Sequence, residues 1–179
     1  MNVKFAFCLL AFVLVPEAIP QQRFHAGKVI PEFGKVASVE SDMPVNSSTK
    51  LRICFDVAGK SGQETINQTF DSAARFINLN VEAGAQAKNV KVAIVVHGQA
   101  AMDVTDSKFY GSRNSGRGNH NAKVIATLQE NGTTFYICGQ SAAGLGIEKA
   151  DLLPGVKMAH SAMTAHVLLR QNGFALCPF

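Results

Sequence analysis

The stretch VKVAIVVHG at residues 90–98 decides the fold. It is a nearly continuous run of β-branched residues, which is typical of a strand buried on both faces of a parallel sheet. Before it, apolar residues recur at three- and four-residue spacing over residues 64–85, and this period predicts an amphipathic helix. A second helix is predicted over residues 121–130, capped in front by an Asn and stopped by Asn131-Gly132. A strand between two helices indicates crossover connections of the parallel type.

The same alternation continues along the chain and predicts five strands. A last helix is expected to start after Ser161, whose side chain can cap it, and to end at Asn172. A short helical turn is expected near residues 147–152, between two of the strands. The fold class is therefore α/β, an open and mostly parallel five-stranded sheet with helices on both faces. The five strands are predicted at KLRICFDVAG (50–59), VKVAIVVHG (90–98), TTFYICG (133–139), GVKMAH (155–160) and FALCPF (174–179).

The 179 residues suit one domain preceded by a leader and an arm. Residues 1–20 carry one cation, Lys4, and an apolar run broken by Pro16, which predicts a signal peptide too short to span a bilayer. The alternatives are a buried first strand or a retained anchor. We expect residues 21–49 to form an extended arm over a domain of residues 50–179. The expected location is periplasmic or secreted, with no stable membrane insertion after cleavage.

Positive charge gathers in one segment of this basic chain, whose net charge is +4. Residues 108–123, KFYGSRNSGRGNHNAK, contain lysines and arginines with no acidic residue between them. A solvated loop is the expected structure, and a site for an anion or an acidic partner is the alternative. Because no pattern of stacking aromatic residues accompanies the charge, nucleic acid is not an expected partner.

Loss of the leader would remove Cys8 and leave Cys54, Cys138 and Cys177, an odd number with no CxxC pair. At least one thiol then has no partner within the chain. Cys54 and Cys177 fall inside predicted strands, so we expect poorly accessible thiols with a pKa near or above about 8.5. Cys138 instead ends a strand and is followed by a loop of small residues.

Cys138 is the main candidate for chemistry. In open α/β sheets, sites form at the carboxyl ends of strands, and the backbone N–H groups of Gly139, Gln140 and Ser141 can stabilise a thiolate there. A buried, inert cysteine that only fills space is the alternative. His97 also ends a strand, and it can serve as a base for Cys138 if the two strands are neighbours, or it can be purely structural.

No cofactor is expected from the motifs in the chain. A GxGxxG turn after the first strand and a P-loop are both missing, which argues against nucleotide or flavin. His160 ends another predicted strand, and a Cys/His/His set with Cys138 and His97 would suit zinc or copper. The spacing along the chain has no metal signature, so no metal ligand is assigned.

Several motifs in a fixed order resemble the DsrE/DsrF-like family, in an exported branch, over about residues 27–179. The resemblance implies a flavodoxin-like subunit that assembles into homotrimers or homohexamers, with some members carrying sulfur as a cysteine persulfide. It matches Cys138 and His97 to the family's cysteine and histidine, while His160 stands where a small or apolar residue is expected. The motifs are VIPEFGKVASV (29–39), CFDVAG (54–59), VAIVVHGQA (92–100), NHNAKVIATLQENG (119–132), YICGQSA (136–142) and DLLPGVKMAHSAMTAHVLLRQNGFAL (151–176).

These observations favour a sulfur carrier or sulfurtransferase-like protein in which Cys138 accepts sulfane sulfur and passes it on, with His97 as its catalytic partner. The expected partner is a sulfur-donating or sulfur-accepting protein or small sulfur compound. One alternative is a non-catalytic oligomeric module that binds a small ligand or serves assembly; another is a metal- or redox-linked accessory protein that uses His160. The residues assigned to substrate binding are Gly98, Gly139, Gln140, Ser141 and Asn121.

Overall fold

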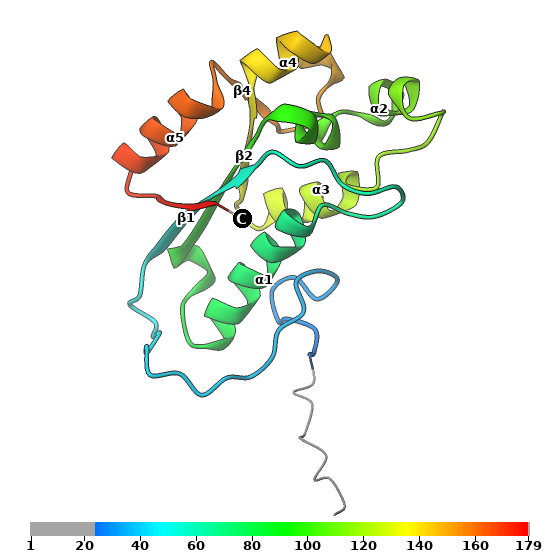
Figure 1. The fold of residues 1–179 in the computed structure, drawn as a ribbon. Coiled ribbons are helices and arrows are strands. Elements are labelled where there is room, and N and C mark those ends of the chain that lie inside the picture. Colours follow the sequence, from blue (N-terminus) through cyan, green and yellow to red (C-terminus); the bar gives the residue numbers. More distant parts are fainter. Residues whose placement is uncertain (1–23, 179) are drawn as a thin grey trace, which may run out of the picture.

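A computed structural model of the protein describes residues 24–178 and shows one sheet of five parallel strands (Figure 1). The strand order is β4-β3-β2-β1-β5, with the long strand β2 in the middle. This architecture confirms the predicted parallel α/β class. The predicted signal peptide, residues 1–20, lies outside the described residues. The strands are β1 (Leu51–Val57), β2 (Val90–Val96), β3 (Thr134–Cys138), β4 (Lys157–Ala159) and β5 (Ala175–Pro178).

The register places the carboxyl ends of four strands at one edge of the sheet. Val96 pairs with Val57 of β1 and with Ile137 of β3, and Cys138 pairs with Ala159 of β4. The residues that follow these ends along the chain therefore lie next to one another. β2 and β3 are neighbours, which is the condition for His97 and Cys138 to share a site.

Helices cover both faces of the sheet. α1 (Gln68–Glu82) and α3 (Ala122–Glu130) pack on one face, and α5 (Ala162–Gln171) lies on the other (Figure 1). The α1 face holds the larger core, in which the rings of Phe70 and Phe135 meet edge to face with centroids 5.3 Å apart. The α5 face holds a much smaller cluster, whose buried members are Cys54, Ala93, Val95 and Ala165.

Three of the predicted helix ends are confirmed, one of them at Asn131, which ends α3 before Gly132 with φ of 84°. The Ser161 side chain accepts a hydrogen bond from the Thr164 backbone N–H, and α5 ends at Asn172, before Gly173 with φ of 81°.

At the start of α3 the position is right, and the Asn side chain that accepts a backbone hydrogen bond there is that of Asn119, from the Asn121 N–H over 2.9 Å. Asn121 precedes the helix without a capping bond, because its side chain is used in a buried polar network.

Two segments expected to be loops are helical. The basic segment contains α2 (Ser107–Arg113), which starts because the Asp106 carboxylate accepts a hydrogen bond from the Phe109 backbone N–H. The small-residue segment after Cys138 is α4 (Gly139–Leu145), which ends at Gly146 with φ of 67°. The expected turn near residues 147–152 is η3 (Lys149–Asp151), and two further 3₁₀ turns are η1 (Ala87–Asn89) and η2 (Gly98–Val104).

The segment before β1 lies against α1, and Asn78 makes the largest set of hydrogen bonds to it. Asn78 of α1 accepts a hydrogen bond from the Ile30 backbone N–H, and its amide lies 2.9–3.1 Å from the carbonyl oxygens of Ile30, Phe33 and Gly34. Ile30 is fully buried beside the helix. Across residues 24–178, none of the helices has the length and apolar character needed to traverse a lipid bilayer.

Candidate functional site

A cavity of about 320 Å³ opens at the carboxyl edge of the sheet, between the ends of β1, β2 and β3 and the start of α5. It contains both residues that the sequence predicted as catalytic, Cys138 and His97. It also contains Asp56 and His166, which the sequence analysis did not single out. The lining residues are Asp56, His97, Cys138, Gln140, Ser141, Ser161, Ala162, Met163 and His166.

The environment of Cys138 favours its thiolate. The residue is 6% exposed, and burial alone would raise the pKa of its thiol. Hydrogen bonds from the backbone N–H groups of Ser141, Gln140 and Ala162 and from the Ser141 hydroxyl outweigh burial, so the pKa of Cys138 lies below its ordinary value. The donors come from the first turns of α4 and α5, where backbone N–H groups have no partner within the helix.

The Ser141 hydroxyl connects the ends of two strands. Its oxygen accepts a hydrogen bond of 2.9 Å from the backbone N–H of Gly98, which follows β2. Its hydrogen is then directed to the sulfur of Cys138 at the end of β3. A hydroxyl that accepts one hydrogen bond while donating another is polarised by the first, which strengthens the second.

His97 lies in the same cavity as Cys138 but is held by a different residue. Its Nε2 atom is 3.0 Å from Oδ1 of Asp56. The same carboxylate oxygen lies 2.7 Å from Nε2 of His166, which comes from α5. Within residues 24–178, no hydrogen bond joins His97 directly to Cys138.

The residues predicted to bind substrate fall into two places. Gly98, Gly139, Gln140 and Ser141 all lie at the Cys138 end of the sheet. Gly98 contributes its N–H group, and Gly139 leaves no room for a side chain, since an added Cβ would be 2.7 Å from the Ala159 carbonyl oxygen. The side-chain amide of Gln140 donates to the His160 carbonyl oxygen over 3.3 Å.

Asn121 is the exception, because the structure does not bring it to this cavity. It is fully buried, and its side chain accepts from the Asn67 backbone N–H and donates to Ser61 and Asn119. Asp103, also fully buried, accepts hydrogen bonds from Ser61 and Asn67 in the same network. Asn121 therefore has a structural role in joining α1, η2 and α3.

The pKa prediction holds for the other two described cysteines, whereas the prediction of poor accessibility holds for the buried Cys54 but not for Cys177, which is only half-buried. Burial, with a smaller contribution from the negative charge of Asp56, raises the pKa of Cys54 to about 12. Burial also raises the pKa of Cys177. Each of the three cysteines described is a free thiol, so Cys138 is distinguished by its surroundings rather than by its oxidation state.

Two residues of the cavity were missed from sequence. Asp56 had a usable signal, because it is near the end of a predicted strand and a carboxylate there is uncommon in a core. His166 had none, since it lies in the middle of a helix and its distance from Asp56 depends on how α5 crosses the sheet. His160, by contrast, is not among the residues that line the cavity.

Among residues 24–178, no group of three or more His, Cys, Asp and Glu side chains is arranged to hold a metal ion.

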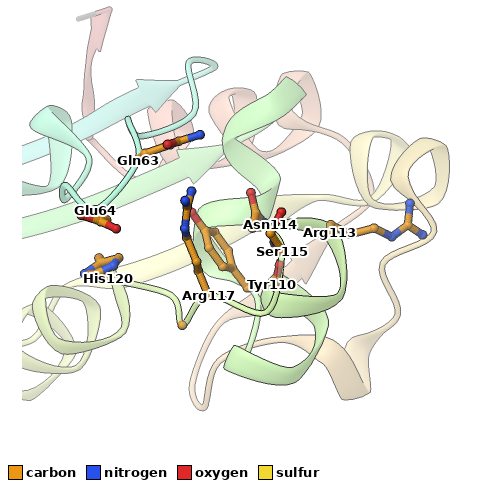
Figure 2. Close-up of a pocket in the computed structure, with 9 residues that line it drawn as sticks. Gln63, Glu64, Tyr110, Arg113, Asn114, Ser115, Arg117 and His120 are labelled. Atoms are coloured by element: carbon orange, nitrogen blue, oxygen red, sulfur yellow. Dashed lines mark hydrogen bonds between the residues drawn. The ribbon is translucent and has the colours of Figure 1, made fainter.

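The basic segment forms a separate, smaller pocket of about 170 Å³. Figure 2 shows Arg117 beside the ring of Tyr110, while Arg113 points away from it. Lys60 lies 5.2 Å from the centre of the Tyr110 ring and bonds to the Asn114 side chain.

Within the basic segment itself, Lys123 pairs with Glu32 over 2.8 Å and the guanidinium of Arg113 lies 5.5 Å from the centre of the Phe109 ring. The positive charge of this segment is thus partly used in contacts within the protein.

The fold and the site together define a parallel α/β protein with an activated thiol at the carboxyl edge of its sheet. The sequence matches the DsrE/DsrF-like family over residues 65–179, and the chain belongs to that family. No curated protein matches the sequence.

Two solved structures share the fold. One is the protein of unknown function MTH1491 from Methanobacterium thermoautotrophicum, with a TM-score of 0.54 and 16% identity, covering 73% of this chain and all of that one. The other is the ychN protein from E. coli, with a TM-score of 0.53 and 15% identity, covering 72% of this chain and 99% of that one. At such identities the similarity supports the fold alone.

Proposed function

We propose that the protein is an exported sulfur carrier in which Cys138 accepts sulfane sulfur as a persulfide and transfers it to an acceptor. The observation that carries the proposal is the contrast among the described thiols. Hydrogen bonds lower the pKa of Cys138 in an open cavity, while burial raises the pKa of Cys54 and of Cys177. A thiolate is the form that attacks sulfur.

The reaction balances without an external oxidant. The Cys138 thiolate attacks the outer sulfur of a donor persulfide or polysulfide, and its electron pair forms the new S–S bond. The S–S bond of the donor breaks, and its electron pair leaves with the donor thiolate, which takes up a proton. Transfer to an acceptor thiolate repeats the same displacement in the opposite direction.

Assembly into a homotrimer or homohexamer and a periplasmic or secreted location belong to the same proposal. Support for assembly comes from α5, which borders the cavity and exposes Met163 (77%), Val167 (56%) and Leu168 (53%). Apolar side chains that share one helix are a common site of subunit contact. Support for export is the apolar run at residues 5–15.

The intact mass of the mature protein before and after incubation with polysulfide tests the function. We expect mass increases in steps of one sulfur atom on Cys138, abolished by Cys138→Ala and preserved by the control Cys177→Ala. Retention of full sulfur uptake by Cys138→Ala would refute the proposal.

A ligand-binding module is the second candidate, favoured by the cavity wall of Ala162 and Met163 beside the thiol. In that case polysulfide adds no mass to Cys138, while a small ligand that does not react with thiols still protects Cys138 from alkylation by occupying the cavity.

A further inference from the structure

One oxygen atom of Asp56 lies close to two histidines. Oδ1 is hydrogen-bonded to Nε2 of His166 over 2.7 Å and lies 3.0 Å from Nε2 of His97, in an ion-pair contact. An ionised carboxylate has no hydrogen to donate, so Nε2 of His166 must carry its hydrogen, and a hydrogen on Nε2 of His97 is what makes its close approach to the same oxygen attractive. In the neutral form of each ring, the lone pair is then on Nδ1.

The far side of His166 gives independent support for this assignment. Its Nδ1 atom lies 3.5 Å from the sulfur of Cys54. Cys54 is 2% exposed, and burial raises its pKa to about 12, so it remains a thiol and has an S–H group to donate. The Phe55 carbonyl oxygen is a second acceptor for the single S–H hydrogen, at the longer distance of 3.8 Å. With the S–H group directed to the nearer Nδ1, the thiol and the carboxylate select the same tautomer of His166.

Four side chains therefore form one connected chain: Cys54 and His166 are hydrogen-bonded, His166 donates to Asp56, and Nε2 of His97 lies 3.0 Å from the same oxygen of Asp56. The members come from β1, from the residue after β2 and from α5. The chain lies beside Cys138, because three of its members line the cavity of the thiol. The Cys54 thiol is thus the buried end of this row of four side chains rather than a second reactive sulfur.

We propose that Asp56 and His166 are positioning residues that hold His97 as its Nε2–H tautomer, so that Nδ1 is the atom that takes and returns the proton during sulfur transfer at Cys138. The proposal rests on the sulfur-carrier function. Nδ1 accepts the proton of the Cys138 thiol, the thiolate displaces the donor thiolate from its outer sulfur, and the imidazolium returns the proton to that leaving group. Asp56 stabilises the imidazolium in the interval, as a carboxylate behind a catalytic histidine does.

Two measurements on one variant test the proposal. Asp56→Asn removes the charge and gives the two rings an amide that can accept from one and donate to the other. We expect the nitrogen NMR spectrum of the His97 ring to change from the Nε2–H tautomer to a mixture, and the rate of sulfur transfer to fall about tenfold or more. Alkylation of Cys138 at a pH where its thiolate is fully formed should be unchanged, because that reaction needs no base.

A matched control is the other carboxylate–histidine pair, in which Nε2 of His25 lies 3.0 Å from Glu82. Glu82→Gln removes a carboxylate from a histidine outside the cavity, and sulfur transfer should be unaffected. The unmodified protein supplies a second test that needs no variant: an Nδ1–H tautomer of its His97 would overturn the proposal. So would a normal transfer rate in Asp56→Asn. If the unmodified protein takes up no sulfur while its His97 is the Nε2–H tautomer, the carrier function fails and the assignment of the tautomer stands.

Discussion

The Ser141 hydroxyl is expected to contribute a defined share of the reactivity of Cys138. Ser141→Ala removes the side-chain hydrogen bond to the sulfur and keeps the backbone N–H bond from the same residue. A hydrogen bond to a charged group contributes about 1.5–3 kcal/mol, and one pKa unit corresponds to about 1.36 kcal/mol. Because three backbone donors remain, we take the lower end and expect the pKa of Cys138 to rise by about one unit.

The pH at which alkylation of Cys138 reaches half its maximal rate measures this shift. One unit reduces the thiolate fraction about tenfold at pH values below both pKa values, but a more basic thiolate is also about threefold more reactive, given a Brønsted slope of about 0.4–0.5. The rate at low pH should therefore fall only about threefold. The midpoint of the pH profile is the more direct readout.

Ser112→Ala is the control, since the Ser112 hydroxyl donates to the Phe109 carbonyl oxygen on α2 and not to a thiol. It should leave the profile unchanged. A midpoint that moves by less than about 0.3 unit in Ser141→Ala, or that moves to lower pH, would contradict the role given to this hydroxyl.

Three further predictions follow from the packing. A thiol reagent near pH 6.5 should label Cys138 well before Cys54, whose pKa is raised to about 12, and mass spectrometry of the peptides should show this order; faster labelling of Cys54 would contradict it. Asn78→Asp places a carboxylate against three arm carbonyl oxygens and should lower stability to urea at pH 7 by about 1–3 kcal/mol; because folding raises the pKa of the introduced carboxyl, the loss should grow as pH rises from about 4, and below that pH only the smaller loss of amide hydrogen bonds should remain. Gly139→Ala should lower the melting temperature, because its Cβ would meet a β4 carbonyl oxygen at 2.7 Å, whereas Gly144→Ala, with open space around it, should not.

The order of strands and helices was predictable because apolar residues recur at helical spacing in the helices and alternate or run continuously in the strands. Residues 90–98 and 133–139 read as buried strands from their sequence alone, and Cys138 and His97 followed from the rule that sites form at strand ends. The register then confirmed that these two strands are neighbours.

The rest of the site depends on contacts between residues that are far apart in the sequence, and these contacts cannot be predicted from a local sequence pattern. The α4 segment is rich in glycine and small polar residues, which favour loops, and its helix forms where Gly139 packs directly against β4. His166 approaches Asp56 only because α5 crosses back over the face of β1, and this crossing is set by strand order. Asn121 was assigned to substrate binding, but it is fully buried and its side chain bonds within a polar network away from the cavity.

The hydrogen bond from Ala162 to Cys138 ties the chemistry of the thiol to the docking of the last helix. α5 is held by a small apolar cluster in which Ala165 is its one buried residue among those described, so the helix should open locally at a lower free energy than the Phe70 side of the sheet. Each opening removes one donor from the sulfur and raises the pKa of Cys138 for as long as it lasts. Amide exchange in α5 and thiol reactivity at Cys138 then report the same equilibrium, and a substitution on the outer surface of this helix can tune the thiol without touching the cavity.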